Sequence, residues 1–282
     1  MKGQVVKVIS ENFYISHKDE IIVCKQRGKL KKTKNLPLVG DFVIFNKEKG
    51  VIEQIIPRKN VIIRPNVANI DQALIVTSLK TPDFSTNLLD KLLVQLEINK
   101  IKPIICLTKE DLLEDLEIEK YQNILNYYRK IGYLVISNQE KDKIKEILEN
   151  KVTVFTGQTG AGKSTLLNNL FPSLNLKTDE VSLALNRGKH TTRHTEIIEV
   201  NNIKVLDTPG FSALSFLNYQ KEDVRNAFLE FKDFPCLYQD CMHIKESECL
   251  VKKSVLEGKI LESRYLNYVS FIKEFTGKES RY

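Results

Sequence analysis

Apolar and polar residues alternate in short runs over the first 66 residues, which is the pattern of half-buried β-strands. Turn signals such as Val39-Gly40-Asp41 separate these runs. The predicted strands are Gly3–Ile9, Asn12–Ser16, Glu20–Cys24, Asp41–Phe45 and Gly50–Ile56. Five short strands in so few residues suit a small closed barrel of the oligonucleotide/oligosaccharide-binding (OB) type. We therefore expect an OB-fold domain over residues 1–66.

From about residue 68, apolar strands alternate with helical stretches. The predicted strands are Gln72–Thr77, Pro103–Leu107, Tyr133–Ile136, Val152–Thr156 and Lys204–Leu206. The predicted helices are Leu88–Asn99, Glu117–Ile131, Lys141–Glu149 and Lys163–Leu170. This alternation predicts βαβ units, and hence an α/β domain with a mostly parallel sheet covered by helices, over residues 67–214.

Beyond residue 212 the pattern becomes helical and includes a Cys/His cluster, so residues 215–282 form a third predicted domain. Its last stretch, Leu256–Phe275, carries Tyr265, Leu266, Tyr268, Val269, Phe271 and Ile272 among charged residues. We expect a helix there that packs on the preceding domain, and a helix that contacts RNA is the second interpretation.

Composition excludes several classes of protein. The chain has 282 residues, of which 42% are hydrophobic, and no apolar run reaches the length of a membrane span. No signal peptide is visible at the N-terminus, so the five cysteines are expected to be reduced thiols or metal ligands. We expect a cytoplasmic, monomeric protein with no membrane contact.

The positive charge is concentrated at the N-terminus. Residues 1–66 hold 14 basic and 6 acidic residues, whereas the whole chain has a net charge of +7. Six basic side chains occur within ten residues: Lys25, Arg27, Lys29, Lys31, Lys32 and Lys34. We predict that they bind RNA phosphates, and an ordinary solvated face is the alternative.

A glycine-rich loop follows the strand Val152–Thr156 and precedes a helix. Its sequence is Gly157-Gln158-Thr159-Gly160-Ala161-Gly162-Lys163-Ser164-Thr165. The G-x-x-x-x-G-K-S pattern between a strand and a helix predicts a nucleotide phosphate loop, because its backbone N–H groups can surround phosphate. Lys163 is expected to neutralise the phosphates and Ser164 to ligate Mg²⁺. A chance glycine-rich turn is the alternative.

A second phosphate contact is expected at Asp207-Thr208-Pro209-Gly210, after the strand Lys204–Leu206. Asp207 can hold Mg²⁺ through water, and the N–H of Gly210 can contact a γ-phosphate. An ordinary Pro-Gly turn is the alternative interpretation. The polar segment 187–194 between the two loops suits a mobile switch. Within it we choose Thr192 over Thr191 as the further Mg²⁺ ligand.

Two segments match loops that bind guanine. Thr108-Lys109-Glu110-Asp111 follows a strand and is similar to the Asn-Lys-x-Asp motif, in which the aspartate accepts hydrogen bonds from guanine. Ser137-Asn138 stands where a second base loop is expected. Thr108 and Asn138 depart from the usual residues, and a charged helix start is the alternative for the first segment. Both segments precede the phosphate loop, so the domain is predicted to be a circularly permuted GTPase.

Cys236, Cys241, His243 and Cys249 fall within fourteen residues. Three thiolates and one imidazole form a closed tetrahedral set for one structural Zn²⁺. The spacing differs from that of common zinc fingers, and buried thiols beside a surface histidine are the alternative. Cys24 and Cys106 lie inside apolar strands and are expected in the core.

Together these motifs resemble the ribosome small-subunit-dependent GTPase A family, over essentially the whole chain. The matching segments are Arg27–Lys29, Pro37–Asp41, Asn69–Gln72, Gly157–Thr165, Gly188–Arg193, Asp207–Phe211 and 236–249. The resemblance implies GTP hydrolysis stimulated by the small (30S) ribosomal subunit, a role in its late maturation, and binding of 16S rRNA.

The position that often holds a catalytic glutamine is Phe211, which cannot orient water. His190 is our candidate catalytic residue, as the resemblance also implies. There are two alternatives. His190 only hydrogen-bonds backbone or phosphate, or the ribosome supplies the catalytic group. A scaffold on precursor rRNA, a GTPase of the large subunit and an ATPase are competing functions. Asp111 disfavours the ATPase, because adenine would leave its carboxylate unpaired.

Overall fold

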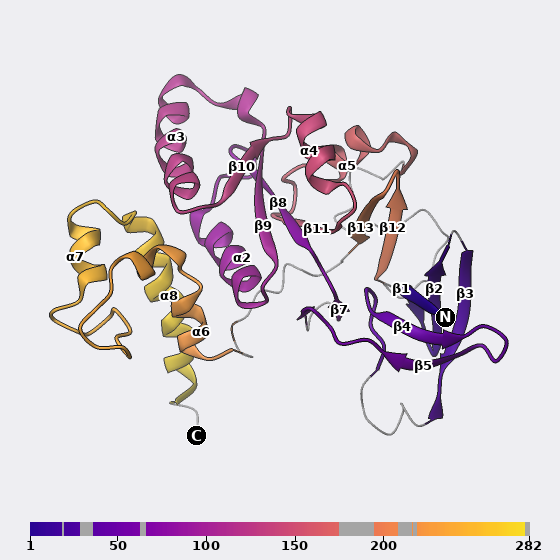
Figure 1. The fold of residues 1–282 in the computed structure, drawn as a ribbon. Helices are drawn as coiled ribbons and strands as arrows, with labels where there is room; N and C mark the ends of the chain where they lie inside the picture. Colours follow the sequence, from indigo (N-terminus) through magenta and orange to yellow (C-terminus); the bar gives the residue numbers. More distant parts are fainter. Residues whose placement is uncertain are drawn as a thin grey trace. The chain divides into compact units, whose positions relative to one another are not determined.

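The computed structural model describes residues 1–18, 20–28, 36–62, 66–174, 195–207, 216 and 219–279. The chain divides into two compact units. Unit 1 comprises residues 1–74, 138–156 and 162–211, and unit 2 comprises residues 75–137, 157–161 and 212–282. Figure 1 shows the elements of both units. The division into three consecutive domains stays a prediction.

Unit 1 begins with a closed five-stranded barrel (Figure 1). Its strands are β1 (Lys2–Ile9), β2 (Asn12–His17), β3 (Glu20–Gln26), β4 (Phe42–Asn46) and β5 (Val51–Ile55). β1 pairs with β2 and β4, β2 with β3, and β4 with β5, all antiparallel, while β3 pairs with β5 in parallel. This closed order, 1-2-3-5-4-1, is that of an OB fold. The predicted barrel is therefore confirmed.

Alternate side chains of these strands fill the barrel. The buried core consists of Val5, Phe13, Ile15, Cys24, Val43, Phe45 and Ile52. Burial raises the pKa of the Cys24 thiol, so it behaves as a small apolar side chain, as expected from its position in an apolar strand.

A tightly built turn links the barrel to the residues that follow it. Gly40 has φ +94°, and a Cβ there would lie 1.9 Å from the carbonyl oxygen of Ala68, so only glycine fits. Asp41 is fully buried, and it accepts hydrogen bonds from the N–H of Leu38 (2.7 Å) and from two nitrogens of Arg58 (2.8 and 2.7 Å). Bidentate arginine pairing fixes orientation as well as distance.

The residues after this turn also contact strand β11 (Val152–Gly157), which leads into the phosphate loop. The carboxylate of Asp71 accepts a hydrogen bond from the N–H of Val152 at 2.8 Å. The amide of Gln72 donates to the hydroxyl of Thr153 at 3.0 Å. These contacts give the Asn69–Gln72 segment a structural role in unit 1.

Three further strands of unit 1 are β11, β13 (Ile203–Asp207) and β12 (Glu196–Val200). β11 and β13 are parallel, whereas β12 is antiparallel to β13 and pairs with β1 at Lys7↔Glu196. β12 is absent from the elements predicted from sequence. Its turn gave a usable signal, because Asn201 and Asn202 both have positive φ, as the two-residue turns of tight hairpins require. Within the described residues, the helices of this unit are α4 (Lys141–Leu148) and α5 (Lys163–Leu170), with a 3₁₀ turn at Pro172–Leu174.

Unit 2 holds strands in the order β10-β9-β8, with helices beside them (Figure 1). Its elements are β8 (Gln72–Ser78, which starts in unit 1), α2 (Thr86–Ile98), β9 (Lys102–Thr108), η1 (Glu110–Leu112), α3 (Asp115–Lys130) and β10 (Leu134–Ser137). β9 and β10 are parallel, so the predicted α/β arrangement is confirmed. Two short strands, β6 (Val61–Ile62) and β7 (Val67–Ala68), form a separate ribbon in unit 1.

The C-terminal part of unit 2 is helical, as predicted. It contains α6 (Lys221–Asn226), η3 (Leu229–Asp233), α7 (Leu250–Leu256) and α8 (Glu262–Glu279). α8 packs against α2, with Tyr268 and Phe271 buried, which agrees with a helix packed on the GTPase core. Among the described residues, no helix is long and apolar enough to cross a bilayer.

A fully buried ion cluster joins α8 to α2 and η3. The Arg264 guanidinium donates to Asp90 at 2.7 Å and to both carboxylate oxygens of Glu230 at 2.7 and 2.9 Å. Burial disfavours this charge, but the Asp90 and Glu230 carboxylates raise the pKa of Arg264 above its usual value. Tyr128 and Asn267 also donate to Asp90.

Candidate nucleotide and metal sites

The glycines of the phosphate loop adopt conformations that other residues avoid. Gly157, Gly160 and Gly162 have φ of +131°, +78° and +92°. A Cβ on Gly157 would lie 2.0 Å from the carbonyl oxygen of Val76, so the loop can leave β11 only through glycine. α5 then begins at Lys163, with Ser164 and Thr165 in its first turn. Burial lowers the pKa of the Lys163 ammonium, an environment in which a phosphate would be a favourable partner.

Thr108 connects the end of β9 to the phosphate loop. Its hydroxyl is buried and donates to the carbonyl oxygen of Ala161 at 2.7 Å, with the carbonyl of Thr77 at 3.4 Å. The residue that departs from the usual asparagine therefore ties the predicted base loop to the loop at residues 157–161.

Lys109 makes a second tie between these loops. It has φ +59°, and its ammonium donates to the carbonyl oxygen of Gly160 at 3.0 Å and to that of Thr81. The carboxylate of Asp111 is exposed in η1 and has no hydrogen bond or ion pair within the described part of the chain. It is therefore open to hydrogen-bond donors from a ligand.

The second predicted base loop is held by Glu110, which occupies the variable position of the Thr108–Asp111 motif. The hydroxyl of Ser137, at the end of β10, hydrogen-bonds the carboxylate of Glu110. β9 and β10 run in parallel with Ser137 beside Leu107, so both loops leave the same edge of the sheet. Sequence reasoning missed Glu110 and Thr81, because a variable motif position and a distant carbonyl carry no sequence signal.

Several predicted site residues lie outside the described residues. They are His190, Thr192, Gly210, Lys29, Lys31, Lys32 and Lys34. Asp207 ends β13, but its side chain is not among the described ones. Lys25 and Arg27 are described, and both are exposed at the end of β3.

Cys236, Cys241, His243 and Cys249 are brought together in unit 2, with all four ligand atoms within 4.8 Å of one another. The Nδ1 atom of His243 lies 3.4, 3.3 and 3.3 Å from the three sulfurs, and the sulfurs of Cys236 and Cys249 are 3.6 Å apart. A zinc ion with bonds of about 2.3 Å to sulfur and about 2.0 Å to nitrogen gives tetrahedral edges of about 3.5–3.8 Å. The cluster is therefore consistent with a zinc site.

The surroundings shift the four members of the cluster in different directions. Burial, followed by the charge of Arg225, lowers the pKa of His243 to about 4, so the imidazole is neutral. Burial opposes ionisation of Cys236, but the backbone N–H groups of Val251 and Leu250 lower the pKa of its thiol. Cys249 caps α7 and accepts from the N–H of Lys252. Burial nevertheless raises the pKa of the Cys249 thiol, and it raises that of Cys241 to about 12, so these two thiols lose their protons only when a metal ion binds.

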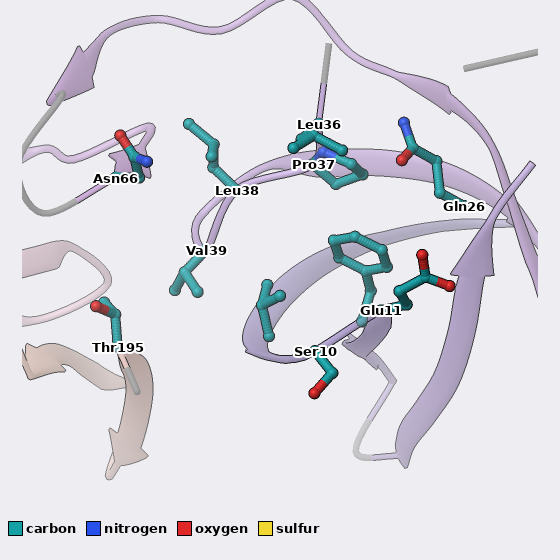
Figure 2. Close-up of a pocket in the computed structure, with 11 residues that line it drawn as sticks. Ser10, Glu11, Gln26, Leu36, Pro37, Leu38, Val39, Asn66 and Thr195 are labelled. Atoms are coloured by element: carbon teal, nitrogen blue, oxygen red, sulfur yellow. The ribbon is translucent and has the colours of Figure 1, made fainter. Parts of the chain in front are cut away.

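A separate cavity of about 570 Å³ opens at one end of the barrel (Figure 2). Leu36, Pro37, Leu38 and Val39 form one wall, and Ser10 and Glu11 lie on another. Its lining is mostly apolar and contains no described cation, so it lacks the chemistry of a phosphate site. Leu36, Asn66 and Thr195 each border residues outside the described part, and we assign this cavity no ligand.

Comparison with known proteins agrees with this geometry. The model of the RsgA GTPase family matches residues 55–217, and that of the RsgA N-terminal domain matches residues 2–52. Proteins named small ribosomal subunit biogenesis GTPase RsgA are similar over nearly their full length. The one from Bacillus cereus (strain ATCC 10987) is 43% identical, covering 100% of this chain and 99% of its own. The one from Latilactobacillus sakei is 45% identical, covering 96% and 95%.

Two solved structures share the fold. The crystal structure of YjeQ from Thermotoga maritima has a TM-score of 0.85 at 33% identity, covering 98% of both chains. That of YloQ, described as a circularly permuted GTPase, has a TM-score of 0.82 at 37% identity, covering 100% of this chain and 96% of the other. With a family model that spans more than half of its residues, the chain belongs to the RsgA family of circularly permuted GTPases.

Proposed function

We propose that this protein hydrolyses GTP to GDP and phosphate during biogenesis of the small ribosomal subunit, and that the subunit stimulates its turnover. The observation that carries the proposal is the pair of hydrogen bonds from Thr108 and Lys109 to the loop at residues 157–161. They hold a base-reading motif against a phosphate loop, in the permuted order of the RsgA family. The relatives named above support the ribosomal assignment.

The nucleotide is assigned to residues of both motifs. The backbone of residues 157–162 and Thr165 surrounds the phosphates, and Lys163 neutralises them. Asp111 accepts hydrogen bonds from guanine, the stem of Lys109 lies against the base, and Ser137 belongs to the second base loop. Ser164 and Thr192 hold Mg²⁺, with Asp207 acting through water, and Gly210 contacts the γ-phosphate. Bound Mg²⁺ neutralises charge on the phosphate oxygens.

Hydrolysis needs a group that orients the attacking water, and Phe211 cannot supply it. We assign this role to His190, with a group from the small subunit as the alternative. Lys25, Arg27, Lys29, Lys31, Lys32 and Lys34 contact phosphates of 16S rRNA. One Zn²⁺ per chain, held by the Cys₃His cluster, has a structural role. The protein acts as a cytoplasmic monomer.

The first experiment measures GTP turnover by the purified protein alone, with isolated small subunits and with isolated large subunits. We expect a several-fold rise with small subunits only. Equal rates in all three reactions would remove the ribosome as activator and favour a scaffold role. Stimulation by large subunits alone would indicate that the protein acts on the large subunit.

Guanine reading by Asp111 has its own test, in the Asp111→Asn variant. The carboxylate accepts from the N–H groups of guanine, whereas an amide can donate to the extra carbonyl of xanthine. We expect GTP turnover to fall about tenfold or more, and xanthosine triphosphate turnover to rise. Asp115→Asn, at an exposed carboxylate in the first turn of α3, serves as the matched control. A variant that keeps its preference for GTP would contradict the assignment.

A further inference from the structure

The turn that joins β8 to α2 reaches the predicted base loop. It comprises residues 79–85, and we name it the β8–α2 turn. The N–H of Leu79 donates to the carbonyl oxygen of Thr108, at the end of β9, over 3.2 Å. The buried hydroxyl of Ser78 donates to the carbonyl oxygen of Lys80 at 2.8 Å. These hydrogen bonds fix the start of the turn against the end of β9.

Thr81 has an unusual backbone conformation within this turn. Its φ is +54°, in the left-handed region that β-branched residues rarely occupy. Its carbonyl oxygen accepts a hydrogen bond from the ammonium of Lys109, which also donates to the carbonyl of Gly160 at 3.0 Å. Pro82 lies beside the phosphate loop, since a Cβ on Gly160 would be 3.6 Å from its Cδ. Costly backbone conformations persist where the surroundings fix them, and they concentrate at functional sites.

Lys80 connects the same turn to the start of α3. Its ammonium lies 2.7 Å from the carboxylate of Glu117 and 3.6 Å from that of Glu114. The carboxylate of Glu117 also accepts from the N–H of Glu114 at 3.0 Å, which closes the first turn of the helix. Phe84 meets Tyr121 of α3 edge to face, with ring centroids 5.4 Å apart. The β8–α2 turn is therefore tied to α3 by an ion pair and by a ring contact.

The chain on both sides of Asp111 is thus anchored to one turn. Asp111 follows Lys109 and precedes Glu114, in the short 3₁₀ turn before α3. Thr81 holds Lys109 on one side, and Lys80 holds the start of α3 on the other. A carboxylate that accepts two hydrogen bonds from one base must be aligned with both donors. The orientation of this short segment therefore decides whether the second hydrogen bond forms.

We propose that the β8–α2 turn is a specificity-determining element of the guanine site, with Lys80 and Thr81 as its positioning residues. Both act through the segment that carries Asp111. Held in this way, the carboxylate accepts from N1–H and from the 2-amino group of guanine together. The inference rests on the proposed function, because it takes a guanine nucleotide as the ligand. Hypoxanthine keeps N1–H but lacks the 2-amino group, so a comparison of the two bases measures the second hydrogen bond.

Competition binding with the full-length protein tests the proposal. GDP or inosine diphosphate displaces a fluorescent GDP analogue in the presence of Mg²⁺. The wild type should prefer GDP about tenfold or more, because inosine diphosphate lacks one donor to the carboxylate. In Lys80→Ala the affinity for GDP should fall about threefold to fivefold, the range that an exposed ion pair allows. The affinity for inosine diphosphate should change less, so the preference for GDP should shrink.

Further variants show whether the ion pair itself carries the effect. Lys80→Arg keeps the charge and should retain the preference. Glu117→Gln removes the charge but keeps an oxygen for the N–H of Glu114, so it should match Lys80→Ala. The double variant should be no worse than either single one, because both remove the same contact. Lys259→Ala is the matched control, since it breaks an ion pair of the same 2.7 Å length with Glu257 and should bind both nucleotides as the wild type does.

Thr81 is tested through its backbone, because its contact with Lys109 is made by a carbonyl oxygen. Thr81→Gly should keep the preference for GDP, since glycine adopts positive φ and retains the carbonyl. Thr81→Pro should lose it, because proline fixes φ near −65° and turns the carbonyl away from the ammonium. Far-ultraviolet spectra and urea unfolding midpoints verify that both variants are folded.

Two results would overturn the proposal. One is a Lys80→Ala variant whose preference for GDP equals that of the wild type. The other is an equal loss of affinity for both nucleotides together with a lower unfolding midpoint, which would make the ion pair a purely structural contact. A wild type that binds GDP and inosine diphosphate equally would instead count against guanine reading by Asp111, and with it against the proposed function.

Discussion

Thr108 ends strand β9 with a short side chain at a position where the related motif has asparagine. The hydroxyl is buried, and it reaches the carbonyl of Ala161 at 2.7 Å, so the shorter side chain still ties the base-reading strand to the phosphate loop. One hydroxyl proton satisfies one carbonyl, and the donor capacity of an amide is not needed for that contact. We interpret Thr108 as a positioning residue rather than a group that touches the base.

Replacing Thr108 by Val tests this interpretation, because valine keeps the shape but leaves the Ala161 carbonyl without its buried donor. We expect a loss of about 1–3 kcal/mol in unfolding free energy and weaker GDP binding. Thr108→Ser restores the hydroxyl and should recover most of both. The measurements are urea unfolding and titration with a fluorescent GDP analogue. If Thr108→Val and Thr108→Ser bind GDP equally, the hydroxyl does not position the loop.

At the level of secondary-structure elements, a loop positions the four metal-ligand candidates in the C-terminal part of unit 2. Residues 236–249 contain no helix or strand, yet they bring four ligand atoms within 4.8 Å. Glu246 accepts hydrogen bonds from the N–H groups of Met242, Ile244 and Lys245, which holds the loop closed. α7 begins at the last cysteine of the cluster, so the helix start and the ligand set are coupled.

Removal of the metal should therefore disorder this segment, because three thiols and an imidazole without an ion provide little cohesion. We expect about one zinc per chain by elemental analysis, and a loss of helical signal in circular dichroism with a strong chelator. Cys241→Ser should lower both the zinc content and the helical signal. Cys106→Ala is the matched control, because Cys106 is buried in β9 away from the cluster and its variant should keep the metal. A protein that is fully folded and free of zinc would contradict the structural role.

At the scale of the whole molecule, long-range polar contacts decide which segments act together. Arg264 lies 174 residues from Asp90 and 34 residues from Glu230, and its side chain is 0% exposed. A buried arginine with two carboxylates needs every hydrogen bond in the cluster to offset desolvation. The C-terminal helices are therefore fixed to α2 by geometry as well as by apolar packing.

Arg264→Met should destabilise the protein by about 3–5 kcal/mol, because Asp90 and Glu230 would remain buried without a counter-charge. Urea unfolding followed by circular dichroism measures the loss. Lys259→Ala breaks the exposed ion pair with Glu257 and is the control, and its unfolding midpoint should match that of the wild type. Equal stabilities of Arg264→Met and wild type would show that apolar packing alone holds the helices.

Much of the fold could be predicted, because short-range patterns specify it. Strand alternation predicted the barrel, and βαβ alternation predicted the α/β arrangement. β12 was not predicted, although the Asn201-Asn202 turn that joins it to β13 is typical of a tight hairpin. The pairing of β1 with β12 had no sequence signal, since it joins residues far apart in the chain. Residues 175–194, including His190 and Thr192, lie outside the described part, so their assigned roles stay predictions.

The chemistry of each local segment follows from its own residues. The glycines and Lys163 of the phosphate loop, Asp111 of the base motif and the four Cys/His ligands follow from spacing over a few residues, where chain geometry alone restricts position. The contacts between segments, in contrast, are set by the folded arrangement of the chain. Thr108 meets Ala161 across 53 residues, and Ser137 meets Glu110 across 27. Such contacts depend on how strands align in the folded sheet, which no local pattern encodes.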